Sequence, residues 1–354
     1  MVLLFAMKKG VPRVCLGDFE TDARRKLPPS VYDFVAGGAG DEITIRWNRE
    51  AYDRRRLRPR VLVDVSKVDT QVRLLGHELP HPILLAPGAY QKLLHPDGEL
   101  ATARGAASAA AVFVVSSNAT VSIEDIAKTA RSPLWLQLYA QTDPGRNREI
   151  IDRAQAAGCQ ALVVTVDTPV IGPRNREQRR GFALPKGLTL PMNPQNQKER
   201  KSKSHERVSL TWRDIEEFRA LSRIPVLLKG ILHPDDADRA ARGGMDGIIV
   251  SNHGGRNLDT APATLDALPG VVDKIGGRIP VLVDGGIRRG TDVVKALAEG
   301  AAAVLIGRPY LYGLAMAGAQ GVADVVRILR TEFEMALALI GHARSADLDR
   351  SVLG

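Results

Sequence analysis

The sequence has few of the residues that mark a secreted, metal-binding or membrane protein. Only two of its 354 residues are cysteines, Cys15 and Cys159, and they form neither a C-x-x-C pair nor a metal-type spacing. No apolar run approaches the roughly 20 residues that a membrane span needs. The apolar start, residues 1–7, is followed rather than preceded by lysines, so we expect a leader extension and not a secretory signal. These absences predict a cytoplasmic protein without a metal site or a membrane partner.

Signs of nucleic-acid binding are also missing, although the formal net charge is +9. The basic residues are scattered, and neither an RNA-binding nor a helix-turn-helix signature is present. A site for small anions accounts for the excess charge equally well, because it needs only a few placed arginines. We therefore expect a small anionic ligand and no nucleic acid.

What the sequence does contain is a repeated unit of strand, loop and helix. Short apolar runs bracketed by turn residues are typical of buried parallel strands, and helical patterns such as 212–221 and 292–299 lie between them. Eight such units favour a closed (β/α)₈ barrel, an α/β fold, over an open doubly wound sheet. The predicted strands are 83–87, 112–116, 134–139, 162–167, 226–229, 247–252, 281–285 and 304–307.

Two segments stand outside this repeat. Residues 1–80 precede the first strand and include a helical pattern at 28–36, so we expect them to form an N-terminal helical cap on a barrel of residues 81–354, within a single domain of about 15–345. A long loop follows the fourth strand, and its stretch 191–209 is polar and basic. That stretch is either a solvated loop or a lid over the barrel mouth.

Polar side chains stand at the carboxyl ends of the predicted strands, where barrel enzymes place their chemistry. The glycines and arginines of DGGIRRG (284–290) and IGRP (306–309) follow the seventh and eighth strands and suit a phosphate group. Lys229 is a nucleophile, an ion-pair partner, or a fixed cation beside an electron-accepting ring. With hydrogen-bonding groups at Ser116, Gln137 and Thr165, this set suits flavin mononucleotide (FMN) better than a sugar phosphate.

The sixth predicted strand is followed by SNHGGR, residues 251–256, in which a histidine and an arginine stand three residues apart. With the other strand ends, this stretch resembles the FMN-dependent α-hydroxy acid oxidase and dehydrogenase family, in order from about residue 18 to residue 340. The other motifs that carry the resemblance are QLY (137–139), TVDTP (165–169), LKG (228–230), DGG (284–286) and IGRP (306–309).

The resemblance implies oxidation of an (S)-2-hydroxy acid to the 2-oxo acid, with electrons passed to oxygen to give hydrogen peroxide. His253 matches the catalytic base, Asp167 the carboxylate that orients it, and Tyr139 the hydroxyl near the substrate oxygen. Arg256 and Arg174 match the arginines that bind the substrate carboxylate, with Arg176 as an alternative to Arg174. The cofactor contacts that it implies are Pro87, Gly88, Ala89, Ser116, Gln137, Thr165, Lys229, Ser251, Asp284, Gly286, Arg288, Gly307 and Arg308.

The resemblance also implies a homotetramer or octamer and leaves two alternatives open: a dehydrogenase that passes electrons to a quinone or a protein, and a non-redox isomerase on an FMN barrel. The sequence departs from glycolate- and lactate-type members at Phe34, where they carry a tyrosine, and glycolate oxidase has a tryptophan in place of Asn118. With Tyr90, either a core or a pocket residue, these positions look most like hydroxymandelate oxidases. We therefore expect a bulky or aromatic substrate.

Overall fold

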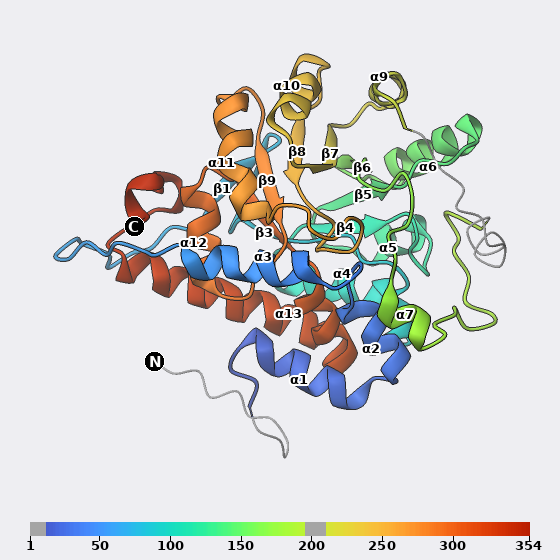
Figure 1. Cartoon of the computed structure of the whole chain (residues 1–354), viewed down its shortest axis with the longest axis horizontal. Helices are drawn as coiled ribbons and strands as arrows, with labels where there is room; N and C mark the ends of the chain where they lie inside the picture. Colours follow the sequence, from blue (N-terminus) through green and yellow to red (C-terminus); the bar gives the residue numbers. More distant parts are fainter. Residues whose placement is uncertain (1–11, 195–209) are drawn as a thin grey trace.

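The computed structural model describes residues 12–194 and 210–354, so the apolar start and most of the polar stretch 191–209, expected as a solvated loop or a lid, lie outside it. Its centre is a closed barrel of eight parallel strands, in the order β10-β3-β4-β5-β6-β7-β8-β9 (Figure 1). The predicted (β/α)₈ fold is confirmed, and each predicted strand is present. The barrel strands are β3 (Ile83–Leu85), β4 (Phe113–Ser116), β5 (Leu134–Leu138), β6 (Ala161–Thr165), β7 (Val226–Ile231), β8 (Gly247–Val250), β9 (Val281–Asp284) and β10 (Ala303–Ile306).

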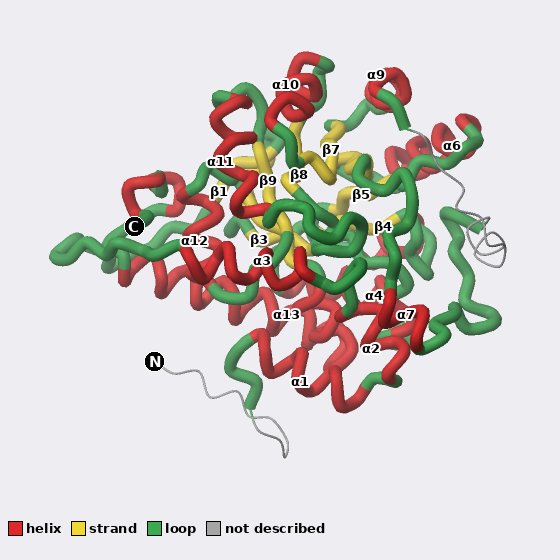
Figure 2. The backbone as a smooth tube through the Cα atoms, in the orientation of Figure 1, coloured by secondary structure: helices red, strands yellow, loops and turns green. Residues whose placement is uncertain are grey.

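Helices follow the strands and surround the barrel (Figure 2). The helix predicted at 212–221 is α9, with the same ends, and the pattern at 292–299 belongs to α12. Within the described residues, no helix is long and apolar enough to cross a membrane. The barrel helices are α4 (Glu99–Ser108), α5 (Ile123–Thr129), α6 (Pro144–Ala156), α7 (Asn175–Arg179), α9 (Trp212–Leu221), α10 (Pro234–Arg242), α11 (Thr264–Ile275), α12 (Gly290–Ala298) and α13 (Arg308–Leu339); short 3₁₀ helices are η1 (Gln91–Leu93), η2 (Ser345–Asp347) and η3 (Arg350–Val352).

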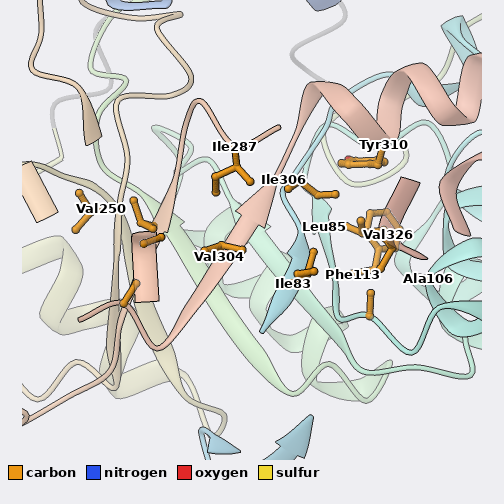
Figure 3. Close-up of a cluster of buried hydrophobic side chains, with 14 of the residues drawn as sticks. Ile83, Leu85, Ala106, Phe113, Val250, Ile287, Val304, Ile306, Tyr310 and Val326 are labelled. Carbon is orange, nitrogen blue, oxygen red and sulfur yellow. The ribbon is translucent and has the colours of Figure 1, made fainter. Parts of the chain in front are cut away.

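The strands bury both faces, and alternate residues belong to two different hydrophobic clusters. Outward residues such as Leu85 and Phe113 pack with helix residues such as Ala106 and Val326 (Figure 3). The inward residues form a second cluster that fills the barrel: Leu84, Val112, Val114, Trp135, Ala161, Val163, Leu227, Ile249, Leu282, Ala303 and Leu305. Because side chains alternate along a strand, the next inward position of each strand lies at its carboxyl end.

Residues 12–80 contact both ends of the barrel. Helices α1 (Leu16–Lys26) and α2 (Pro29–Ala36) lie against α13 (Figure 1). A hairpin of β1 (Val72–Leu74) and β2 (His77–Leu79) adds Leu74 and Leu79 to the inner cluster, which indicates that it closes the amino-terminal end of the barrel. The sequence analysis missed this hairpin, because strands of three residues are too short to show a period of two.

Helix α3 (Ile43–Arg54) binds the loop that follows β8. Asn48 and Asn252 exchange amide hydrogen bonds of 3.0 and 2.8 Å, and the Asp259 carboxylate accepts from the backbone N–H of Thr44 at the start of α3. Gly255 has a φ of +73°, and a Cβ there would lie 2.9 Å from the backbone nitrogen of Ile45. The glycine is required by the close approach of α3, which places the cap beside the barrel mouth.

Candidate active site

The barrel mouth carries a ring of polar side chains at the inward positions that follow the apolar cluster. On one side, Ser116 Oγ donates to Gln137 Oε1 over 3.1 Å, and Gln137 Nε2 donates to Thr165 Oγ1 over 2.9 Å. On the other, Lys229 Nζ lies 2.7 Å from Ser251 Oγ and 2.9 Å from Asp284 Oδ2. All six come from different strands or strand ends, so closure of the barrel brings them together.

A cavity of about 1840 Å³ opens above this ring. This volume exceeds that of a typical single-ligand pocket, so there is room for a cofactor and a substrate together. Of the predicted site residues, Asp167, Gln137 and Ser251 lie behind the lining and bind residues that form it. The others line it: Phe34, Pro87, Gly88, Ala89, Tyr90, Ser116, Asn118, Tyr139, Thr165, Arg174, Lys229, His253, Arg256, Asp284, Gly286, Arg288, Gly307 and Arg308.

His253 stands at the centre of a hydrogen-bonded chain of three side chains. Its Nδ1 lies 3.0 Å from Asp167 Oδ1, and its Nε2 lies 3.0 Å from the hydroxyl of Tyr139. Its backbone is left-handed, with a φ of +57°, and so are the backbones of Gly254 and Gly255. Such a conformation is uncommon for a side-chain-bearing residue and turns the imidazole out of the strand direction into the cavity.

Burial and charge set the protonation of this pair. Burial lowers the pKa of His253 below its ordinary value, and this effect outweighs the opposing charge of Asp167. Burial alone would raise the pKa of Asp167, but the charge and hydrogen bond of His253, together with Lys229, hold it below the ordinary value. A neutral imidazole beside an ionised carboxylate is a suitable proton acceptor, because the carboxylate stabilises the imidazolium that forms.

Two largely buried arginines, Arg174 and Arg256, face the cavity beside His253, and both bind Glu177. Arg174 Nη1 and Arg256 Nη2 each lie 3.1 Å from the same oxygen, Glu177 Oε1. Burial, with the charges of Arg174 and Arg308, lowers the pKa of Arg256 to about 9, while Glu177 opposes the shift. The guanidinium therefore remains charged at neutral pH. Two cations held together at a cavity wall suit the carboxylate of a ligand.

The alternative arginine lies elsewhere. Arg176 does not line the cavity; its Nη2 lies 2.5 Å from Glu42 Oε2, and its side chain is 42 % exposed, compared with 15 % for Arg174. The geometry thus favours Arg174 as the partner of Arg256. Glu177, which the sequence analysis missed, stands three residues after Arg174, a spacing that brings two side chains together on a helix.

Aromatic rings form another part of the cavity wall. The ring of Phe34 stacks on that of Phe182 with centroids 4.7 Å apart, and it meets Tyr90 at 5.7 Å. The sequence left Tyr90 as either a core residue or a pocket residue. In the structure it is both: its side chain is buried, and it lines the cavity. Phe182 is a second residue that the sequence analysis missed, since one aromatic residue in a loop carries no periodic signal. Near these rings, Asn118 Oδ1 accepts from Asn193 Nδ2 over 3.1 Å.

The opposite part of the cavity fits a ligand with a polar ring and an anionic tail. Lys229 supplies a buried cation, and Asp284 Oδ1 is a buried acceptor without a hydrogen-bond partner in the described chain. Arg288 and Gly307 line the same cavity, and Gly307 precedes the first residue of α13, a helix start that favours negative charge. These residues fit the ring, ribityl chain and phosphate of FMN.

Arg308 has a further role, in joining three segments. Its Nε donates to the Val35 carbonyl, its Nη1 to the Gly254 carbonyl and its Nη2 to the Gly37 carbonyl, over 2.9 to 3.0 Å. The predicted contact with phosphate stays a prediction. Elsewhere in the described ranges, no group of three His, Cys, Asp or Glu side chains is placed to hold a metal ion.

Known proteins similar to this chain agree with an FMN site in the barrel mouth. Residues 23–354 match the model of a family described as FMN-dependent dehydrogenase. The chain is 47% identical to an L-lactate oxidase of Nostoc sp. over 96% of this chain and 97% of that protein, and 44% identical to glycolate oxidase 1 of Oryza sativa subsp. indica over 94% of each. A crystal structure of mandelate oxidase, 41% identical, covers 97% of this chain with a TM-score of 0.90.

Proposed function

Because the chain belongs to the FMN-dependent dehydrogenase family, we propose that it oxidises an (S)-2-hydroxy acid to the corresponding 2-oxo acid. The substrate loses two electrons and two protons, and oxygen accepts them to form hydrogen peroxide. The observation that carries the proposal is the joint presence of the Tyr139–His253–Asp167 chain and the Arg174–Arg256 pair in one cavity. The named relatives, an L-lactate oxidase and glycolate oxidases, support oxygen as the acceptor.

Different side chains of the cavity bind different groups of the substrate. Arg174 and Arg256 bind its carboxylate, which places the adjacent carbon next to His253. The neutral imidazole accepts a proton from the substrate, and Asp167 stabilises the resulting imidazolium. Tyr139, whose hydroxyl lies 3.0 Å from His253 Nε2, hydrogen-bonds the substrate oxygen and directs it toward the base.

FMN, when bound, supplies the acceptor for the two electrons that leave the substrate carbon. Ser116 and Thr165 would hold its ring through their hydroxyl groups, with Gln137 behind them fixing both. Lys229 would supply a cation that stabilises the negative charge that develops on the ring. Asp284 would accept from the ribityl chain through its free oxygen. Arg288, Gly307 and Arg308 would hold the phosphate, and Pro87, Gly88 and Ala89 would contribute to the same cofactor site.

We propose a bulky or aromatic substrate. Phe34, Phe182 and Tyr90 supply stacking surface, and Phe34 cannot donate a hydrogen bond to the carboxylate as a tyrosine would. Asn118 leaves room where a tryptophan would fill the pocket. The similarity to mandelate oxidase structures supports this choice, whereas the lactate and glycolate oxidases among the relatives keep small substrates as the competing outcome.

Anaerobic reduction of the flavin tests the proposal directly. The purified protein, loaded with FMN, is mixed with glycolate, lactate, mandelate or 4-hydroxymandelate, and loss of the yellow absorbance is followed. We expect the aryl acids to reduce the flavin faster than the small acids. If no 2-hydroxy acid bleaches the flavin, the activity is wrong and a non-redox FMN enzyme takes its place.

The electron acceptor and the assembly need separate measurements. Steady oxygen uptake with stoichiometric hydrogen peroxide supports the oxidase; reduction of a quinone without oxygen uptake would replace it with a dehydrogenase. We further propose a cytoplasmic homotetramer or octamer that binds neither membranes nor nucleic acid. Light scattering coupled to gel filtration gives the assembly mass, and a monomer would contradict it.

A further inference from the structure

Glu177 occupies the two arginines that the proposed function assigns to the substrate carboxylate. A single oxygen, Oε1, is shared by Arg174 Nη1 and Arg256 Nη2, each 3.1 Å away. The side chain of Glu177 is only 12 % exposed, so water screens these contacts weakly. Glu177 therefore presents to the arginines the same group, a carboxylate, that a hydroxy acid would bring.

The arginines do not need Glu177 to keep their positions. Arg256 Nη1 donates to the carbonyls of Phe34 and Gly37 over 2.7 Å each, and its guanidinium lies over the Phe34 ring. Arg174 Nε donates to the Arg256 carbonyl over 3.0 Å. Because these contacts come from backbone oxygens and a ring, they remain when the carboxylate of Glu177 is removed.

The charge balance of the cluster then shows what Glu177 does. Without it, Arg174 and Arg256 are two buried like charges, with Arg308 close enough to act on the pKa of Arg256. With it, one negative charge offsets them before a ligand arrives. A bound carboxylate must lie beside Glu177 and compete with it for the same N–H groups, and two carboxylates at short range repel each other.

We propose that Glu177 acts as an internal counter-carboxylate: it neutralises Arg174 and Arg256 in the ligand-free site and thereby lowers their affinity for the carboxylate of the substrate. The proposal rests on the proposed function, because it takes the arginine pair as the carboxylate site. Glu177 limits binding, and it touches neither the proton acceptor nor the atoms that react. Removal of the Glu177 carboxylate should lower KM and leave kcat nearly unchanged.

The test compares Glu177→Gln with the wild-type holoenzyme in equilibrium binding of two unreactive ligands. Phenylacetate carries the carboxylate but no hydroxyl to oxidise, and phenylacetamide is its neutral counterpart. Binding is followed by the change in flavin absorbance and by the shift in melting temperature. We expect Kd for phenylacetate to fall about tenfold in Glu177→Gln, as expected for loss of one neighbouring like charge, with Kd for phenylacetamide within about twofold of the wild type.

The matched control is Glu42→Gln. Glu42 is a carboxylate of similar burial that binds Arg176 and the Gly38 backbone N–H but neither cavity arginine. We expect it to leave both Kd values within about twofold of the wild type. If Glu177→Gln folds poorly, Glu177→Ala should show the same selective gain for phenylacetate.

Three results would overturn the proposal. The first is an unchanged Kd for phenylacetate in Glu177→Gln, and the second is weaker binding of both phenylacetate and phenylacetamide. The third is an equal gain in phenylacetate affinity in Glu42→Gln. Parallel weakening would mean that Glu177 holds the arginines in place. Failure of the proposed function is a separate outcome, since it appears as a wild-type flavin that no 2-hydroxy acid reduces, whatever phenylacetate does.

Discussion

Nδ1 of His253 lies 3.0 Å from Oδ1 of Asp167, although the two residues stand 86 positions apart in the sequence. Asp167 follows β6 and His253 follows β8, and the strand between them, β7, carries Lys229. Asp167 continues the inward alternation of β6, and the left-handed backbone of His253 turns its imidazole toward it. The pair thus depends on barrel closure, and its protonation depends on the burial that closure creates.

Replacement of His253 should separate cofactor binding from chemistry. Asn tolerates the left-handed backbone at φ +57° better than Ala does, so His253→Asn removes the imidazole with little added strain. We expect the variant to keep its bound flavin and its melting temperature while flavin reduction slows at least about 10³-fold. Stopped-flow anaerobic reduction measures this, and rapid reduction by the variant would contradict the assignment of the base.

The pH dependence follows from the lowered pKa of His253. The imidazole is the active form when neutral, so kcat/KM should stay level as the pH falls to its ordinary pKa of about 6.5 and decline only below it. Asp167 raises the pKa of His253; Asp167→Asn should therefore move this acidic decline to still lower pH and reduce the plateau rate about 10²- to 10⁴-fold. A decline that moves to higher pH in the variant would show that Asp167 does not act on His253.

A tyrosine at position 34 should shift the enzyme toward small substrates. Phe34→Tyr adds a hydroxyl near the arginine pair, and a hydrogen bond to a charged carboxylate contributes about 1 to 3 kcal/mol. All three substrates gain this bond, but the added hydroxyl also makes the aromatic wall less apolar for an aryl group, so we expect KM for lactate and glycolate to fall about tenfold relative to KM for mandelate. Tyr32→Phe is the control. It removes a hydroxyl from the same helix, α2, but that hydroxyl donates to Glu20 and lies outside the cavity. An unchanged ratio of KM values would remove Phe34 from the determinants of specificity.

The two glycines of the SNHGGR stretch should tolerate alanine differently. Gly254 and Gly255 both have positive φ, so alanine is strained at either position. At Gly255 the new methyl group would meet the Ile45 backbone at 2.9 Å, whereas at Gly254 it would meet a side-chain atom, Arg308 Nη1, at 3.0 Å. We expect Gly255→Ala to lower the free energy of unfolding by about 2 kcal/mol more than Gly254→Ala. Thermal denaturation of the two variant holoenzymes measures this difference. Equal losses of stability in the two variants would show that α3 moves away to make room for the methyl group at position 255.

The strand positions and most of the candidate site could be predicted from the sequence. Each barrel strand is an apolar run that is buried on both faces, and the polar residue that ends it falls at the mouth because parallel strands all point the same way. Ser116, Thr165 and Lys229 were found in this way, before any contact between them was known. His253 and Arg256 were found because they follow such a run directly.

Contacts between distant segments could not be predicted in this manner. Glu177 and Phe182 were missed because they lie in the loop after β6, where no periodicity distinguishes a pocket residue from a solvated one. The hairpin β1-β2 was missed because its strands are short. Asp259, which accepts from the backbone N–H of Thr44 at the start of α3, stands three residues after the SNHGGR stretch, but nothing in the sequence indicated its partner.

The sequence by itself determined the barrel and the residues at the ends of its strands, because burial of alternate side chains is a local property that repeats along the chain. Only the tertiary structure decided how those residues act. It placed Asp167 and Tyr139 on opposite nitrogens of His253 and brought Glu177 onto both arginines. These relations join residues from different strands and loops, and they exist only where packing sets distance, burial and charge together.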